Sequence, residues 1–206
     1  MKGILNMIKK TLLGIIAVFV FVFTFANVSQ ASSQTYSKGI NTPHWQKKPI
    51  NVYIPLDAKS QSMKNAFSKW SSVSSGKLSF TYSSSEKDKD KADIIVSFTD
   101  KTEGLETKLG GYSISTNGNK ITKGTITIAT KSKLAKKYSN NYIYTTMLHE
   151  VGHVIGMKDN SRKESTIMYM PLSEKQDITK LDIRQLYKIN GWSYADRNMP
   201  SQRDKE

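Results

Sequence analysis

The 206-residue sequence contains no cysteine. Disulfide bonds are therefore excluded, and the fold must be stabilised by other means, such as packing or bound metals. The same absence excludes a bacterial lipoprotein, which needs a cysteine directly after its leader segment. It also excludes regulation by a cysteine that blocks a metal site.

Acidic residues are scarce relative to basic ones, with 17 Asp and Glu against 31 Lys and Arg and a formal charge of +14. Such an excess is usually a solvated surface, but it also favours acidic substrates or retention on anionic polymers of a Gram-positive cell wall. The sequence has no zinc-finger pair and no aromatic–basic sheet motif, so we do not expect nucleic acid as a partner.

Long apolar runs are limited to residues 12–26, which follow a segment with three lysines. This run is shorter than the roughly 20 residues that span a bilayer. Small residues at both ends of 29–31 are typical of a cleavage site. We therefore predict that residues 1–31 are a signal peptide, and that the mature protein is extracellular and has no membrane contact. A retained membrane anchor is the alternative.

The remaining chain is long enough for one domain with its own core. We divide it into a flexible or short pro-segment at 32–43, a folded domain at 44–193 and a polar tail at 194–206. No internal repeat is present, and we expect a monomer.

Two of the three histidines lie four residues apart, at His149 and His153. On an α-helix this spacing places both imidazoles on one face, where they suit two ligands of a tetrahedral Zn²⁺. Glu150 is rotated by about 100° from His149, so it can flank the metal and accept a proton from water. A surface helix that happens to carry two histidines is the alternative.

A third ligand must come from outside that helix. Gly156 can adopt the left-handed conformation that ends a helix and turns the chain. Asp159 then supplies a carboxylate, with Asn160 as the nearest alternative. His44, the remaining histidine, is predicted to be a packed or surface residue rather than a ligand.

The resulting pattern, H-E-x-x-H-x-x-G-x-x-D, resembles the metzincin zinc-protease signature, in which a third histidine normally stands at the position of Asp159. In its aspartate it is similar to the small secreted neutral proteases of the snapalysin type. Downstream, Ser165-Thr166-Ile167-Met168-Tyr169 resembles the metzincin Met-turn. This resemblance implies that Met168 packs beneath the metal without binding it. It also implies that the following residues, Tyr169, Met170, Pro171 and Leu172, line the pocket for the residue after the scissile bond.

Hydrophobic periodicity predicts the other elements. An amphipathic helix is expected over 59–73, and 83–91 reads as a charged loop. Strands are expected where apolar and polar residues alternate or where apolar residues run together, at 50–54, 78–82, 92–98, 112–115 and 125–129. The strand at 92–98 is the most continuously apolar and should be central. Asn117-Gly118 predicts a hairpin-like turn.

Two helix starts carry capping signals. Asn140 or Asn141 is predicted to cap the histidine helix, which would run to about Met157. Thr179 and Asp182 resemble the capping pair of a C-terminal helix.

The order of elements between Trp45 and Trp192 resembles the matrixin branch, including Ala-Phe-x-x-Trp in the first helix and Ala-Asp-Ile-x-x-x-Phe in the third strand. This resemblance implies an α+β fold with a twisted, mixed five-stranded sheet and two long helices in the N-terminal part. The Met-turn and C-terminal helix would lie below the active-site cleft, where Asp182 would brace the Met-turn.

In metzincins the edge strand ahead of the active-site helix holds the substrate backbone. By resemblance, that edge is formed by Gly111, Tyr112, Ser113 and Ile114. An extended peptide would add to it through main-chain hydrogen bonds. An ordinary exposed edge strand is the alternative.

These observations together predict a secreted zinc endopeptidase acting on proteins or peptides. One catalytic zinc is held by His149, His153 and Asp159, and Glu150 is the general base. Binding of Ca²⁺ in addition to zinc is left open, although the sequence contains no calcium-loop spacing. The alternatives are a basic, wall-associated binding protein with a structural or vestigial metal, and an enzyme restricted to one partner protein.

Overall fold

The computed structural model describes residues 42–100, 108–160 and 163–193, all of which belong to one unit of the chain. The predicted signal peptide, nearly all of the pro-segment and the polar tail lie outside the described residues. No helix in the described part of the chain is long and apolar enough to span a membrane.

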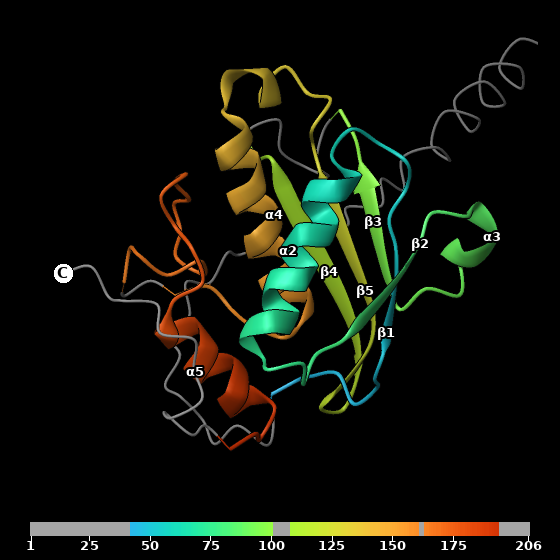
Figure 1. Ribbon diagram of the computed structural model, residues 1–206, viewed down its shortest axis with the longest axis vertical. Coiled ribbons are helices and arrows are strands. Elements are labelled where there is room, and N and C mark those ends of the chain that lie inside the picture. Colours follow the sequence, from blue (N-terminus) through green and yellow to red (C-terminus); the bar gives the residue numbers. More distant parts are fainter. Residues whose placement is uncertain (1–41, 101–107, 161–162, 194–206) are drawn as a thin grey trace, which may run out of the picture. The chain divides into compact units, whose positions relative to one another are not determined.

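Five strands form one sheet in the order β2-β1-β3-β5-β4 (Figure 1). Their bounds are β1 (Ile50–Tyr53), β2 (Phe80–Ser83), β3 (Ile94–Phe98), β4 (Gly110–Asn117) and β5 (Lys120–Ile128). The pairs β1–β2, β1–β3 and β3–β5 are parallel, and β4 pairs with β5 antiparallel. The mixed five-stranded sheet is confirmed, and so is the central position of β3.

Two long helices, α2 (Ser60–Val73) and α4 (Asn140–Val154), lie side by side on one face of this sheet (Figure 1). The apolar stripe of α2 is buried as its spacing predicts, through Met63, Ala66, Phe67 and Trp70. Trp70 also donates its indole N–H to the carbonyl of Leu148 in α4, at 2.9 Å. This bond joins the two helices next to the histidine motif.

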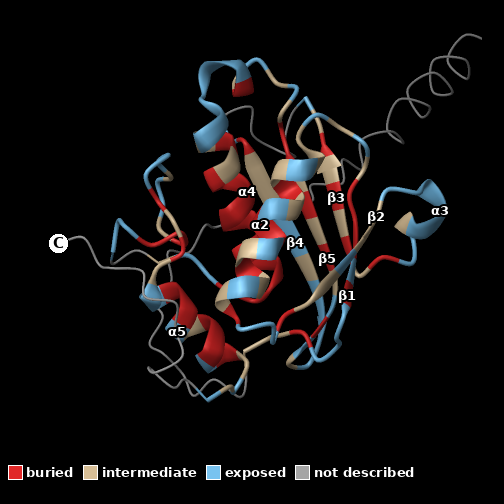
Figure 2. Cartoon of the chain, in the orientation of Figure 1, coloured by how far each residue is buried: buried red, intermediate tan, exposed pale blue. Residues whose placement is uncertain are grey.

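Burial is concentrated in the central strands and in the helix faces turned toward them (Figure 2). In β3, the alternate residues Ile94, Val96 and Phe98 are buried, which places them on one face of the sheet. The edge strand β4, in contrast, contains no fully buried residue. One side of the sheet therefore ends in an accessible strand beside α4.

The hairpin formed by β4 and β5 is longer than predicted. Pairing continues to Asn117 and Lys120, and Gly118 in the turn has φ 59°, a conformation that favours glycine. The residues at the outer end of this hairpin are mostly polar, so they lack the alternation of apolar and polar residues from which strands are predicted.

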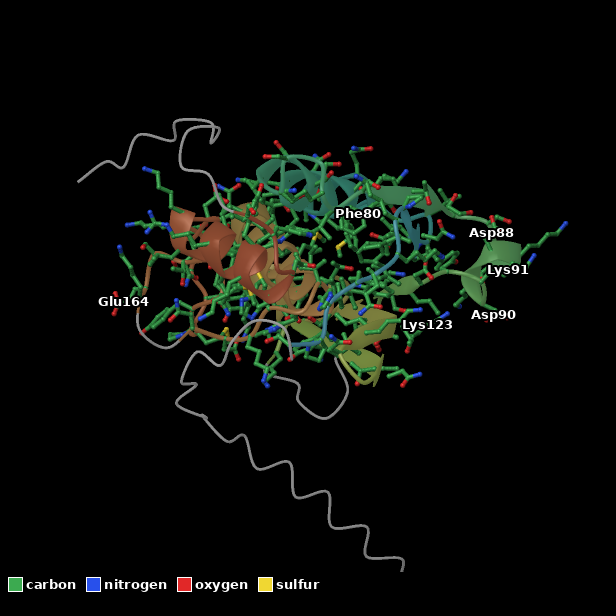
Figure 3. The ribbon with its side chains drawn as sticks, turned by 90° about the horizontal axis from the view of Figure 1, so that it is seen from below. Phe80, Asp88, Asp90, Lys91, Lys123 and Glu164 are labelled. Atoms are coloured by element: carbon green, nitrogen blue, oxygen red, sulfur yellow. The ribbon has the colours of Figure 1, made fainter. Side chains whose placement is uncertain are left out.

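The predicted loop at 83–91 instead contains a short helix, α3 (Glu86–Lys89). All four of its residues are charged and none is buried, so there was no apolar period to detect. Figure 3 shows Asp88 of this helix, with Asp90 and Lys91 just after it, at the opposite end of the domain from Glu164, which lies just before the Met-turn. The helix α3 is therefore remote from the segment that follows the histidine motif.

The cap predicted for α4 was wrong by one residue. Ser139 is the N-cap, and its hydroxyl accepts the N–H of Tyr142 at 3.1 Å. The side-chain oxygen of Asn140 instead accepts from Lys59, at 2.5 Å. The helix also ends earlier than Met157, at Val154. A single 3₁₀ turn, η2 (Ala135–Lys137), precedes it.

The C-terminal helix α5 (Lys180–Ile189) starts as predicted. The hydroxyl of Thr179 accepts the N–H of Asp182, and the Asp182 carboxylate accepts the N–H of Thr179 at 2.8 Å. This reciprocal capping box confirms the signal found in the sequence.

Candidate metal centre

His149 and His153 lie on one face of α4, with their Nε2 atoms 2.9 Å apart. Both side chains are almost fully buried. His149 Nδ1 lies 2.8 Å from the carbonyl oxygen of Ile167, and His153 Nδ1 lies 3.1 Å from that of Met157. A carbonyl oxygen can only accept, so each Nδ1 carries the proton and each Nε2 presents a lone pair.

Asp159 faces the same point from outside the helix. Its Oδ1 lies 3.4 Å from His149 Nε2 and 3.2 Å from His153 Nε2. Ligand atoms of a tetrahedral zinc, bonded at about 2.0–2.1 Å, are separated by roughly 3.3 Å. Two imidazole lone pairs and one carboxylate oxygen at these spacings therefore fit a zinc ion. Within the described ranges, no other group of three such side chains converges.

The turn after α4 delivers this third side chain. Gly156 has φ 100°, and a Cβ there would collide with the carbonyl oxygen of Pro43. The N–H of Met157 then returns to the carbonyl of Gly152 at 3.0 Å. The conformation expected for Gly156 from the sequence is the one observed.

Asn160, the alternative third ligand, is directed elsewhere. Its backbone N–H donates to the carbonyl of Met168 at 2.5 Å, and its side-chain amide lies 3.5 Å from the Thr166 hydroxyl. These contacts tie the segment after Asp159 to the Met-turn. The carboxylate, rather than the neighbouring amide, meets the imidazoles.

The Met-turn supports the site from below. Met168 is fully buried, and Gly152 of α4 packs so tightly against it that a Cβ would meet the sulfur. The N–H of Ile167 donates to the Asp182 carboxylate at 3.2 Å, while the Ile167 carbonyl accepts from His149. Asp182 therefore anchors the backbone of the residue whose carbonyl orients a metal-facing imidazole.

Glu150 points into the same region. It is 6% exposed, and its Oε2 has no hydrogen-bond partner in the described part of the chain. Burial raises the pKa of this carboxyl above its usual value, and the negative charge of Asp159 adds to the effect. A buried carboxylate with a free oxygen beside a metal-binding group is suited to accept a proton.

A cleft of about 490 Å³ opens beside these side chains. It is lined on one side by β4, including the predicted Gly111, Tyr112 and Ser113. Ile114, Tyr169 and Pro171 do not line it, so their contacts with substrate stay a prediction.

Met170 and Leu172, which the resemblance placed in the substrate pocket, do line the cleft. The sequence did not indicate its other aromatic lining, a stacked pair formed by Tyr138 and Tyr142 with ring centroids 4.2 Å apart. Met170 and Leu172 belong to an irregular segment, where no period indicates which side chain faces the cleft. Tyr138 lies before α4 in extended backbone, so its spacing from Tyr142 was not a helical signal.

His44, the third histidine, is not part of this group. Its Nδ1 lies 2.9 Å from the carbonyl of Thr42, and its backbone forms a bridge with Lys120 of β5.

Comparison with known proteins agrees with this geometry. The matrixin family model matches residues 44–191, which is more than half of the chain. No curated protein matches the chain. Together with the donor set at the end of α4, the match confirms the resemblance noted in the sequence: the chain belongs to the matrixin family of zinc-dependent metallopeptidases.

Proposed function

We propose that the chain is a secreted endopeptidase that cleaves internal peptide bonds with Glu150 as the general base. In this proposal His149, His153 and Asp159 hold one zinc ion. The observation that carries the proposal is the free, buried Oε2 of Glu150 next to three convergent ligand atoms. When bound there, zinc would polarise the scissile carbonyl and acidify the attacking water.

The substrate is held by the edge of the sheet. β5 is the only strand that pairs with β4 in the described ranges, so the other edge of β4 is available beside the cleft. An extended peptide can add to this edge through main-chain hydrogen bonds, with its side chains alternating into and out of the cleft. Recognition of the backbone suits a protease that acts within chains.

Glu150 moves the proton. Its free Oε2 takes a proton from the attacking water and later delivers it to the leaving amine. Its raised pKa favours this exchange, since a base that is too acidic holds protons poorly near neutral pH. Because Glu150 follows His149 directly on α4, one helix positions both the base and two ligands.

Secretion is supported by the sequence of residues 1–31, and the excess of lysine supports attachment to anionic wall polymers. The mature protein is proposed to act as a monomer on protein or peptide substrates. Calcium is left out of the proposal, because only one group of potential metal ligands converges among the described residues.

A binding protein with a structural metal is not favoured. Structural zinc usually has four protein ligands and no open position. The described residues bring three ligand atoms together, with the unpartnered Glu150 carboxylate beside them.

The proposal is tested by incubating the zinc-loaded chain with casein and mapping the new termini by mass spectrometry. We expect internal cleavage that stops when a chelator removes zinc and resumes when zinc is restored. Cleavage that survives complete removal of metal would contradict the proposal. A zinc-loaded protein that cuts neither casein nor a mixed peptide library would also contradict it.

A further inference from the structure

The ring of Tyr112 lies flat against the imidazole of His153. The two centroids are 4.0 Å apart and the planes differ by 12°, so the rings are stacked. Tyr112 is 44% exposed and lines the cleft, whereas His153 beneath it is 4% exposed. The tyrosine ring therefore separates one face of a metal-facing imidazole from solvent.

This contact follows from the alternation of side chains along β4. Residues two apart point to the same face of a strand. Gly110 turns toward Glu150, where a Cβ would lie 2.8 Å from Cγ of that residue, and Tyr112 lies over His153. The strand thus contacts α4 at two residues, the proposed general base Glu150 and, about one helical turn later, the proposed metal ligand His153.

His153 has less support from hydrogen bonds than His149. His149 is held by the carbonyl of Ile167, and the N–H of the same residue donates to the buried carboxylate of Asp182. The partner of His153 is the carbonyl of Met157, at the longer distance of 3.1 Å and in the turn beyond the end of α4. The stacked ring of Tyr112 is a second contact that restrains the orientation of this imidazole.

We propose that Tyr112 is a positioning residue of the metal centre: its stacked ring holds the His153 imidazole with Nε2 directed at His149 and Asp159 and shields it from water. This inference rests on the proposed function, because it assumes that the three side chains hold zinc. It adds that the strand proposed to bind substrate also stabilises a ligand, through one aromatic contact.

The test measures zinc affinity rather than proteolysis, by competition with a chromophoric chelator, on the full chain and three variants. Tyr112→Phe keeps the ring and loses the hydroxyl, while Tyr112→Ala loses both. Tyr138→Ala is the matched control, because Tyr138 is an exposed tyrosine of the same cleft that stacks on Tyr142 instead of a ligand. Changes to residues that orient metal ligands typically cost 10–100-fold in metal affinity.

We expect Tyr112→Ala to weaken zinc binding by about 10–100-fold, with Tyr112→Phe and Tyr138→Ala within about threefold of the wild type. The visible spectrum of the Co²⁺-substituted protein should change in Tyr112→Ala and be preserved in Tyr112→Phe. A Tyr112→Ala protein with wild-type affinity and spectrum would overturn the inference. So would equal losses in the Phe and Ala variants, which would assign the effect to the hydroxyl.

Failure of the proposed function gives a different result. If the wild type itself does not bind one zinc ion tightly, the ligand assignment fails before any variant is compared. If the wild type binds zinc and the Ala variant alone loses affinity, but casein is never cut, the positioning role of Tyr112 stands and the endopeptidase proposal falls. Should Tyr112→Ala fail to fold, Tyr112→Leu fills the same space without an aromatic face and is expected to show the same loss.

Discussion

Gly110 of β4 and Glu150 of α4 face each other with no room for a side chain between them. A Cβ on Gly110 would lie 2.8 Å from Glu150 Cγ and 2.6 Å from Thr146 Cγ2, both shorter than real contacts allow. Gly110 has an ordinary backbone conformation, so the glycine is required by this approach rather than by strain.

Gly110→Ala is therefore expected to displace the Glu150 carboxylate and leave the zinc ligands in place. Misplacement of a catalytic group by about 1 Å can cost roughly 10²-fold in rate. We predict a fall in kcat of that order with one zinc ion retained, measured by steady-state peptide cleavage and metal analysis. Gly111→Ala is the control, because a Cβ there has nothing within 4 Å and should lower kcat much less. Equal kcat values for the two variants would refute this contact.

The contact between Gly152 and Met168 predicts an effect on stability. Alanine in a helix interior is favoured over glycine by about 1 kcal/mol, so propensity alone predicts that Gly152→Ala stabilises α4. A Cβ would however meet Met168 Cε at 3.2 Å and the Trp70 ring at 3.1 Å. Overpacking of a core costs about 1–3 kcal/mol.

We therefore expect Gly152→Ala to lower the free energy of unfolding, measured in urea on the zinc-free protein. Asn141→Ala serves as the control, because Asn141 is an exposed residue of the same helix. A higher free energy of unfolding for Gly152→Ala would contradict this prediction, because it would show that Met168 can move aside without loss of stability.

Asp182 predicts a dependence of stability on pH. Burial raises the pKa of its carboxyl, and this outweighs the hydrogen bonds from Thr179 and Ile167, which lower it. The native state then holds the proton more tightly than the unfolded chain. The resulting stabilisation is complete below the unfolded pKa of about 3.9 and is lost as pH rises through the raised native pKa.

Asp182→Asn removes the titrating group and keeps an oxygen that can accept the same hydrogen bonds. We expect the stability of the wild type relative to this variant to be highest at low pH and to decline upward from about pH 4. Urea unfolding of both zinc-free proteins across that range measures the difference. A difference that stays constant or grows with pH would contradict this account of Asp182.

Local patterns predicted the parts of the site that one segment of chain encodes. The helical spacing of His149 and His153 and the position of Glu150 follow from helix geometry alone. Gly156 and Asp159 could be added because a glycine that ends a helix has a recognisable place in the sequence. The capping box of Thr179 and Asp182 is local in the same sense.

Contacts between distant segments could not be predicted in this way. Nothing in the sequence near Tyr112 indicates that its ring lies on His153, since this depends on how β4 is placed against α4. The same holds for Gly110, which reads as a loop glycine until Glu150 is seen opposite it. Of the four residues expected in the pocket after Met168, only Met170 and Leu172 line the cleft, because an irregular turn has no period from which the orientation of each side chain could be read.

The central claim is that Glu150 moves protons while His149, His153 and Asp159 hold the metal. The most direct measurement compares zinc content and casein cleavage in the wild type, Glu150→Gln and Asp159→Ala. We predict that Glu150→Gln keeps one zinc ion and loses at least about 10²-fold in kcat, as removal of a general base usually does. Asp159→Ala should lose both zinc and cleavage. An Asp159→Ala protein that binds zinc as tightly as the wild type, or a Glu150→Gln protein that cuts casein at the wild-type rate, would contradict the account.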